Sequence, residues 1–224
     1  MENPTLDVQV LSDNLRAALA NVKRAINPRT SLPILSYGMV ETDNGQLTLH
    51  GTTLEKAISQ TISAKVAGEG RAVIPVTQLL ASLPAKPAGP VRITANGQDV
   101  SVTLPGGAVL NYHTEMPGDY PSPVRPPDRE PDAYWAGQEL ARAASVVSRA
   151  AAPAQERPIL AGVQLEFGED RATMVAADGF RLALYHLEVS ATGPSRSIIV
   201  PAASLRILAR LIGKPAKRAV DNEP

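Results

Sequence analysis

The sequence predicts an α+β fold in which two similar units of antiparallel strands and helices follow one another, the second of them incomplete. Three observations lead to this prediction: a repeated segment, apolar alternation broken by hairpin turns, and a proline-rich stretch between the repeats. The repeated segments are LPILSYGMVETDNGQLTL, residues 32–49, and RPILAGVQLEFGEDRATM, residues 157–174. A chain of 224 residues is long enough for two such units, each with its own core.

The two copies keep a single register over their matching residues. Five identities recur 125 positions apart: Pro33 and Pro158, Ile34 and Ile159, Leu35 and Leu160, Glu41 and Glu166, Thr48 and Thr173. Further along, RAVIP at 71–75 matches RSIIVP at 196–201, and a leucine-rich stretch of helical character follows each. Each copy is therefore predicted to contain a helix, strands, a short strand and a second helix.

A helix is expected to precede each repeated segment, because apolar residues recur there every three or four positions and so share one face. The first helix is predicted to begin with Ser12 or Asp13 as its N-cap, and Pro153 is expected to stop the helix of the second copy. The apolar stripes are Leu15, Leu19, Val22 and Ile26 in the first copy, and Leu140, Ala144 and Val147 in the second.

Alternation and turn chemistry predict the strands. QLTLHG at 46–51 alternates apolar and polar residues after the turn signal DNG at 43–45, and 91–113 gives three short strands broken at Asn96-Gly97 and Gly106-Gly107. Counterparts of these three strands in the second copy would begin near position 217, where the sequence is KRAVDNEP. We therefore expect the sheet of the second unit to be unfinished, with an open edge and uncovered apolar helix surface.

The segment PGDYPSPVRPPDREP, residues 117–131, contains six prolines and predicts a stiff, extended connector. We expect a first domain over 1–120, a linker over 121–133 and a second, C-terminally truncated domain over 134–224.

Composition excludes several classes of protein. The chain has no cysteine, and His50, His113 and His186 show no ligand spacing, so neither a metal site nor a cofactor is expected. It has no apolar run long enough for a membrane span and no charged-then-apolar leader, which favours a soluble, cytoplasmic protein without a membrane partner. Because the formal net charge is zero, nucleic-acid binding would require the charges to be sorted onto one surface.

Three of the four predicted helices carry such a basic outer stripe. One interpretation is that these charges simply solvate exposed helix faces; the alternative is a phosphate-facing surface that binds DNA without reading its sequence. No aromatic residue interleaves the stripes, which argues against stacking on single strands. The candidate residues are Arg16, Lys23, Arg24, Arg142, Arg149, Arg206, Arg210 and Lys214.

The most conspicuous short motif is AADGFRLALYH, residues 176–186. Its Asp178-Gly179 pair is typical of a hairpin turn, although Asp178 and Arg181 could also act as a carboxylate and an anion clamp. Another hypothesis is a hydrolase that uses Asp178 and His186, but no complete catalytic set is visible in the sequence. The sequence also contains no nucleotide-binding motif and no nucleophile-elbow motif.

Seven segments in order resemble the bacterial DNA polymerase III beta subunit, the sliding clamp, from about Leu11 to Leu211. They are NPRTSLPILSYGMVE, GTTLEKAI, VIPVTQLLASLP, MPGDYPSP, RPILAGVQLEF, AADGFRLALYHLEV and IIVPAASLRILARL. The resemblance implies tandem clamp-type domains. Family members have three copies of the unit, and two chains form a ring around duplex DNA with helices lining the hole. Such a ring is a processivity factor and not an enzyme.

The resemblance also assigns sites and partners. The basic stripes would face the phosphates, joined by Arg29, where the family keeps a DNA-contacting arginine. Short peptides from DNA polymerase III subunits and the clamp loader would bind beside the AADGFRL motif, and the chain would assemble with itself or with a full-length clamp. The implied peptide-binding residues are Leu160, Ala177, Gly179, Phe180, Arg181 and Leu182.

The sequence also departs from the family. The third domain and the end of the second have no counterpart, and Thr77, Gln78, Ala202 and Ala203 stand where relatives often have basic residues. Two hypotheses share the fold: a sliding clamp that encircles DNA, and a truncated paralogue or fragment that binds clamp subunits or clamp-binding peptides as a regulator without encircling DNA.

Overall fold

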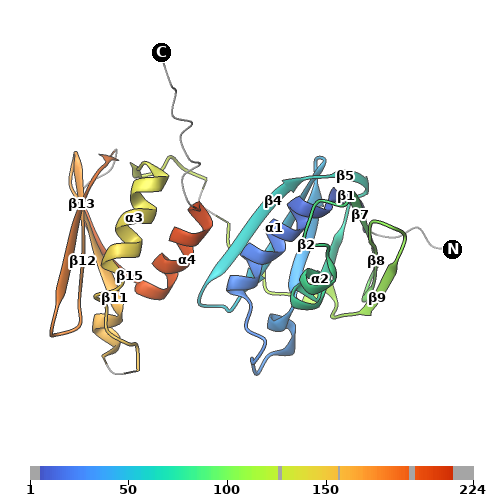
Figure 1. The fold of residues 1–224 in the computed structure, drawn as a ribbon, viewed down its shortest axis with the longest axis horizontal. Helices are drawn as coiled ribbons and strands as arrows, with labels where there is room; N and C mark the ends of the chain where they lie inside the picture. Colours follow the sequence, from blue (N-terminus) through green and yellow to red (C-terminus); the bar gives the residue numbers. More distant parts are fainter. Residues whose placement is uncertain (1–5, 126–127, 156, 192–194, 214–224) are drawn as a thin grey trace, which may run out of the picture. The chain divides into compact units, whose positions relative to one another are not determined.

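The computed structural model describes residues 6–125, 128–155, 157–191 and 195–213. The chain divides into two compact units, Met1–Pro126 (unit 1) and Pro127–Pro224 (unit 2), which are described separately (Figure 1). Helices and antiparallel sheets occur in both units, so the predicted α+β class is confirmed.

Unit 1 contains two antiparallel sheets and two α-helices among its described residues, where the repeat pattern had indicated a single sheet. The helices are α1 (Ser12–Val22) and α2 (Val76–Ser82). One sheet has the order β5-β1-β7-β8-β9 and the other β4-β3-β2-β6. The strands are β1 (Leu6–Leu11), β2 (Gly38–Asp43), β3 (Gln46–Thr52), β4 (Ala57–Ser63), β5 (Lys65–Gly68), β6 (Arg71–Ile74), β7 (Pro90–Asn96), β8 (Asp99–Thr103) and β9 (Val109–His113).

The predicted hairpin turns of unit 1 are confirmed. Between β2 and β3, Asn44 has φ 48° and Gly45 has φ 73°, so both central residues adopt the left-handed conformation that a two-residue hairpin requires. Asn and Gly tolerate this conformation better than other residues, which is why the local sequence fixes the pairing of β2 with β3.

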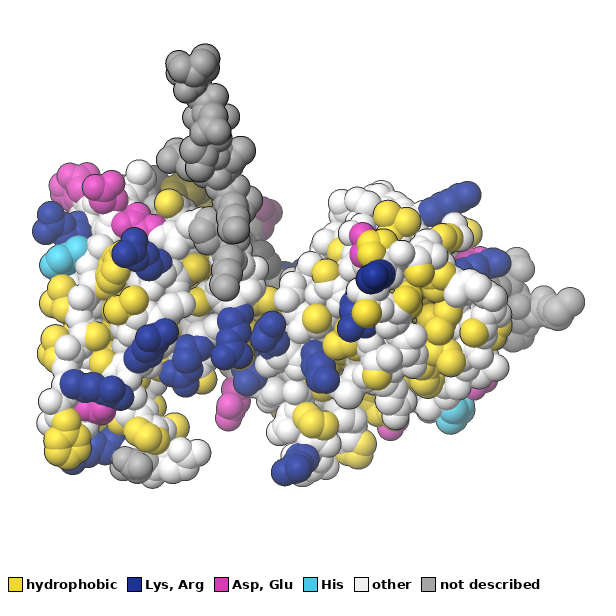
Figure 2. All heavy atoms as spheres, viewed as in Figure 1, with side chains coloured by type: hydrophobic (Ala, Val, Ile, Leu, Met, Phe, Trp, Pro, Cys, Tyr) yellow, Lys and Arg dark blue, Asp and Glu magenta, His cyan; other side chains and the backbone are white. Residues whose placement is uncertain are grey.

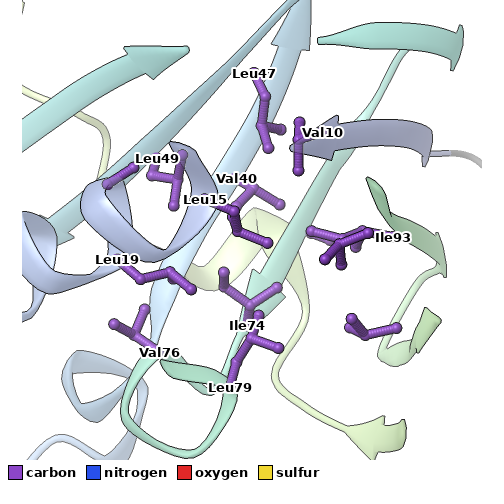
Figure 3. Packing of buried hydrophobic residues seen from close by; sticks show 14 of the residues in the cluster. Val10, Leu15, Leu19, Val40, Leu47, Leu49, Ile74, Val76, Leu79 and Ile93 are labelled. Atoms are coloured by element: carbon purple, nitrogen blue, oxygen red, sulfur yellow. The ribbon is translucent and has the colours of Figure 1, made fainter. Parts of the chain in front are cut away.

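The core of unit 1 lies between the helices and both sheets (Figure 3). Leu15 and Leu19 of α1 and Leu79 of α2 are completely buried and meet Leu49 of β3 and Ile93 of β7. Helix α1 packs closely on β3: a Cβ at Gly51 would lie only 2.7 Å from Val22 Cγ1. Unit 1 therefore has a complete core that joins two sheets through one helix pair.

The N-terminus of α1 differs from the prediction. The N-cap position is Leu11, without a side-chain cap, so the expected cap by Ser12 or Asp13 is wrong. Ser12 is 1% exposed, and its hydroxyl accepts a hydrogen bond from the Ala88 amide at 3.1 Å. Its own amide donates to the Gly89 carbonyl at 3.0 Å. The serine thus binds the loop before β7 and does not cap the helix.

Unit 2 repeats much of this plan. Its helices are α3 (Gly137–Val147) and α4 (Ala202–Ile212), and its sheets have the orders β13-β12-β11-β15 and β10-β14. The strands are β10 (Ala133–Tyr134), β11 (Gly162–Phe167), β12 (Arg171–Ala177), β13 (Leu182–Glu188), β14 (Ser190–Ala191) and β15 (Arg196–Pro201). The four-stranded sheet corresponds strand by strand to β4-β3-β2-β6 of unit 1.

The repeat extends to strand register. In unit 1, β1 pairs with β5 through Val8↔Val66 and Gln9↔Lys65. In unit 2, β10 pairs with β14 through Ala133↔Ala191 and Tyr134↔Ser190, each residue 125 positions further along the chain. Strand β1 also pairs with β7 on its other edge, whereas among the residues described in unit 2 β10 pairs with β14 alone.

The core of unit 2 is correspondingly smaller. In α4, Leu205 is 3% exposed, but Leu208 remains 37% exposed. Trp135 packs on Phe167 with ring centroids 5.3 Å apart, which supports a packing role for this tryptophan. Part of the helix surface that strands β7 and β8 cover in unit 1 stays open in the described part of unit 2.

Candidate DNA-facing and peptide-binding surfaces

Basic side chains gather over the helices of each unit. Figure 2 shows Lys and Arg side chains over α3 and α4 of unit 2, and others over α1 of unit 1. In unit 2, Arg142 of α3, Arg149 just after α3 and Arg210 of α4 are exposed, and in unit 1 Lys23 and Arg29 are exposed at and beyond the end of α1. None of these five forms an ion pair with a described residue, so their charges are available to an external anion.

Two of the predicted DNA-binding arginines also have a structural partner. Arg16 of α1 donates to the carbonyls of Leu80 and Leu83 at 3.1 and 2.9 Å, at the C-terminal end of α2. Arg206 of α4 donates to the Ser148 carbonyl at 3.1 Å, at the C-terminal end of α3. Each guanidinium thus lies at the end of the neighbouring helix, because the free carbonyls there attract a cation.

The remaining two candidates differ from each other. Arg24 is half-buried, and its Nε is buried without a hydrogen-bond partner in the described chain. It lies 125 positions before Arg149, so the two arginines occupy the same place in the repeat, just after α1 and α3. Lys214 lies outside the described residues.

The AADGFRL motif forms the tip of the β12–β13 hairpin. Asp178 Oδ1 accepts the amides of Phe180 and Arg181 at 3.0 and 3.1 Å, and Oδ2 accepts Arg181 Nε at 2.9 Å. The hydrogen bond from the Phe180 amide, together with those from Arg181, lowers the pKa of Asp178. The carboxylate therefore organises the loop, and Arg181 is held beside it.

This arrangement gives no support to the hydrolase hypothesis. His186 Nδ1 lies 3.2 Å from the Thr173 hydroxyl across β12 and β13, while Asp178 is engaged in its own loop. Within the described ranges, no three His, Asp or Glu side chains are placed to hold a metal ion.

The predicted peptide-binding residues combine a polar loop with exposed apolar side chains. Phe180 is 96% exposed and Leu182 66%, while Leu160 and Ala177 are half-buried. Ile159, in the turn that contains Leu160, is 81% exposed. Exposed apolar side chains of this size, rimmed by polar groups, are typical of a surface that binds a partner.

Arg157 joins this surface, and sequence reasoning missed it. A Cβ at Gly179 would lie 2.7 Å from Arg157 Nη1, so the guanidinium rests directly on the glycine. This contact brings the turn at Pro158–Ala161 (η4) next to the β12–β13 loop. The only signal was a basic residue before PILA, where the first copy has Leu32 before PILS.

The duplicated unit of antiparallel sheets and two helices defines a tandem clamp-type fold. The sequence-family model of the DNA polymerase III beta subunit N-terminal domain matches residues 6–124 of this chain. The family model of the central domain matches residues 136–220. The chain therefore belongs to the DNA polymerase III beta subunit family, a family of DNA replication. No described helix is long and apolar enough to cross a membrane.

Known relatives agree with this assignment. The chain is 26% identical over 209 residues to a beta sliding clamp of Streptomyces coelicolor, and 24% identical over 218 residues to one of Staphylococcus aureus. Each match covers 92% of this chain but only 55% and 57% of the relative, so the chain spans little more than half their length.

Solved structures show the same fold. A Bacillus subtilis DNA polymerase sliding clamp superposes with a TM-score of 0.83 at 20% identity, over 92% of this chain and 57% of that one. A DNA polymerase III subunit beta from Pseudomonas aeruginosa superposes with a TM-score of 0.82 at 26% identity, over the same shares.

Proposed function

We propose that the chain acts as a DNA sliding clamp, a non-enzymatic tether that holds a replicative polymerase on duplex DNA without reading its sequence. The observation that carries this proposal is the set of five exposed basic side chains, on or after the helices of both units, that form no ion pair with a described residue. Arg24 and Arg149, at equivalent places in the repeat, support it. A surface of this kind binds phosphates and leaves the bases unread.

The ring itself would be completed by further copies of the chain or by a full-length clamp. Peptides of DNA polymerase III subunits and of the clamp loader would bind at the surface formed by Arg157, Leu160 and Phe180–Leu182. An extended peptide suits this place, because its apolar side chains can pack on Phe180 and Leu182 while its backbone bonds to the loop.

Topology provides the decisive test of encirclement. The protein is mixed with nicked circular plasmid, alone or with a full-length clamp and clamp loader, and the same plasmid is then cut once. A closed ring should stay on the circle and slip off the linear form, and native mass spectrometry should show a closed oligomer. Equal loss from both forms with rising salt would rule out encirclement.

Single charges can be tested through salt dependence. Arg149→Ala or Lys23→Ala should reduce the slope of log affinity against log salt by about 0.9 for each phosphate that the variant no longer neutralises. Arg196→Ala is the matched control in unit 2, because Arg196 is an exposed arginine on β15 that pairs with Asp132 at 3.4 Å. A reduced slope for the control and an unchanged slope for Arg149→Ala would contradict the proposed DNA surface.

A second candidate function is a regulator that binds clamp-binding peptides without encircling DNA. The observation that favours it is that all the candidate peptide-binding residues lie in unit 2. An immobilised clamp-binding peptide should then retain the chain, and Arg181→Ala or Leu160→Ala should weaken retention. Unchanged retention by both variants would remove the peptide surface from either function.

A further inference from the structure

The four-stranded sheet of unit 1 has one face toward the helices and one face away from them. Val40, Leu49 and Ile74 point toward the helices and belong to the main core. Their neighbours along the strands, such as Glu41 and His50, point to the opposite side, because side chains alternate along a strand. We call this opposite side the outer face of unit 1.

The segment Pro117–Arg125, which is the first part of the predicted connector, lies on this outer face. Tyr120 is 6% exposed and packs with Met39 and Val73 in a small cluster of its own. Its hydroxyl lies 3.4 Å from the backbone carbonyl oxygen of His50. The tyrosine therefore fixes the beginning of the segment on the sheet.

The carboxylate of Glu41 holds the other end of the segment. Arg125 Nη2 lies 3.5 Å from Glu41 Oε2, and Arg71 Nη2 donates to Oε1 of the same carboxylate at 2.9 Å. The Arg125 side chain is 73% exposed, whereas that of Glu41 is only 17% exposed. The contact of Arg125 is therefore the longer and weaker of the two ion pairs.

His50 is buried beside the same carboxylate. Its Nδ1 lies 2.7 Å from the Ser59 hydroxyl of β4. Its Nε2 is buried without a hydrogen-bond partner in the described chain, 3.7 Å from Glu41 Oε2, which is too far for a hydrogen bond. The imidazole of His50 and the guanidinium of Arg125 thus face the same carboxylate oxygen.

Protonation of His50 would make the two cations compete for this oxygen. An imidazolium donates from both nitrogens, and the acceptor nearest to Nε2 is Glu41 Oε2. A charge-assisted hydrogen bond there would occupy the oxygen that Arg125 contacts, and the two positive charges would repel each other. The groups that face the His50 ring are Glu41 from β2, Ser59 from β4, Arg71 from β6 and Arg125 from the connector.

The repeated unit does not need a histidine at this place. Val175 of β12 stands where β3 of unit 1 has His50, and its partner on the next strand is Leu184 where unit 1 has Ser59. Unit 2 forms the same four-stranded sheet with these apolar residues. The buried histidine therefore belongs to the face that the connector covers and not to the fold in general.

We propose that His50, Glu41 and Arg125 form a pH-sensitive latch for the connector between the two units. While His50 is neutral, Glu41 holds Arg125 and the latch is closed. When His50 is protonated, its imidazolium takes Glu41 Oε2, Arg125 is released, and Tyr120 alone holds this segment on the sheet. The latch contains none of the candidate DNA-facing or peptide-binding residues, so it does not depend on the proposed function.

The latch should open only in acid. Burial lowers the pKa of His50 below its ordinary value of 6.5, although the charge of Glu41 opposes this shift. The imidazole of the closed state is therefore neutral above pH 6.5, and it takes up its proton as the pH falls below that value.

A spin label on the connector tests this directly. Because the chain has no cysteine, Val124→Cys places a single nitroxide beside Arg125, at a side chain that is 75% exposed. Between about pH 7.5 and about pH 5, the ratio of mobile to immobile label should rise about two- to fivefold, the range expected for the loss of an exposed ion pair. A label at Ala85→Cys, in an exposed loop of unit 1, is the matched control and should not respond.

Two further variants assign the effect to the latch. With His50→Gln, which cannot be protonated, the label at Val124→Cys should stay immobile at both pH values. With Arg125→Ala it should be mobile at both. Linkage is reciprocal, so Arg125→Ala should also raise the pKa of His50, measured by NMR, and shift its protonation constant by the same factor as the label ratio. Circular dichroism verifies that each variant is folded.

Three results would overturn the proposal. The first is an acid response of the label that persists in His50→Gln, or no response in the wild-type background. The second is an equal response at Ala85→Cys, because acid would then loosen unit 1 as a whole. The third is a His50 pKa that Arg125→Ala leaves unchanged, since protonation and the release of Arg125 would then be uncoupled.

Discussion

Strands β6 and β15 occupy the same position in the two units and differ sharply in exposure. Ala72 and Val73 of β6 are completely buried, whereas their counterparts Ile198 and Ile199 of β15 are 45% and 65% exposed. The larger isoleucines are thus the more exposed side chains. In unit 1, segments that follow the second helix, namely β7–β9 and Pro117–Arg125, pack on these strands and help to bury them.

This comparison predicts that the two units have different stabilities. Leu79→Ala should lower the free energy of unfolding of unit 1 by about 3–5 kcal/mol, because the cavity lies in a complete core. The equivalent Leu205→Ala should cost unit 2 only about 2 kcal/mol, since its smaller core collapses more easily around the gap.

Urea unfolding can resolve the two effects. The emission of Trp135, the one tryptophan of the chain, reports on unit 2, and hydrogen exchange of the β2 and β3 amides reports on unit 1. Equal costs at both leucines would show that the described part of unit 2 has a core as constraining as that of unit 1.

The packing of Tyr120, in the segment Pro117–Arg125, on Met39 and Val73 predicts a loss of stability at high pH that is confined to unit 1. Burial raises the pKa of Tyr120 from 10.0 to about 12. The unfolded chain releases this proton first, so the stabilisation is complete below pH 10 and disappears as the pH rises to 12, by about 3 kcal/mol. Tyr120→Phe should flatten this part of the pH profile of unit 1. A similar decline in the Phe variant would mean that other groups cause it.

The two capping arginines sharpen the comparison at the helix ends. Arg16→Ala should destabilise unit 1 by about 1–2 kcal/mol, because it removes two hydrogen bonds to helix carbonyls. Arg206→Ala, which removes one bond from a more exposed side chain, should cost unit 2 about 0.5–1 kcal/mol. Arg142→Ala is the control without a helix-capping bond. Thermal unfolding of the three variants measures these costs. If Arg142→Ala destabilised unit 2 as much as Arg206→Ala does, the loss could not be attributed to the helix-capping hydrogen bond.

The smallest effect concerns acid stability. Burial lowers the pKa of His50. The negative charge of Glu41 opposes this shift, and the positive charges of Arg125 and Arg71 add to it. The unfolded chain takes up the proton first, so this stabilisation is present above pH 6.5 and is lost as the pH falls below it. Unit 2 has Val175 at the equivalent position and should show no matching change. His50→Gln should remove this loss of stability at acid pH from unit 1. If the stability of the variant fell with pH as in the wild type, another group would be its cause.

Local features of the fold could be predicted from the sequence. The repeat, the helices and the turns at Asn44-Gly45 and Asp178-Gly179 follow from periodicity and from residues that tolerate positive φ. The division into two sheets could not be predicted, because the pairing of β1 with β5 and β7 joins segments more than 50 residues apart. Nothing in the local pattern of β1 selects these partners.

The candidate sites show the same limit. Periodicity placed Arg16 and Arg206 on outer helix faces, but it could not show that each lies beside the C-terminal end of the neighbouring helix. The contact of Arg157 with Gly179 depends on the packing of two turns and was missed for the same reason. Arg142 of α3 is exposed as expected, since for it the helix period alone decides the outcome, and Arg149 is exposed just after the helix ends.

The register that β10–β14 shares with β1–β5 restricts how a further strand can pair with β10. In unit 1, Ile93 and Val91 stand opposite Val8 and Val10. The counterparts of Val8 and Val10 in unit 2 are Ala133 and Trp135. A strand that paired with β10 on the edge left open by the described residues would therefore place apolar residues against these two and polar ones against Tyr134. In a longer homologue, this pattern of apolar and polar residues distinguishes a strand in the correct register from one shifted by a single residue, which would place its apolar side chains on the wrong face.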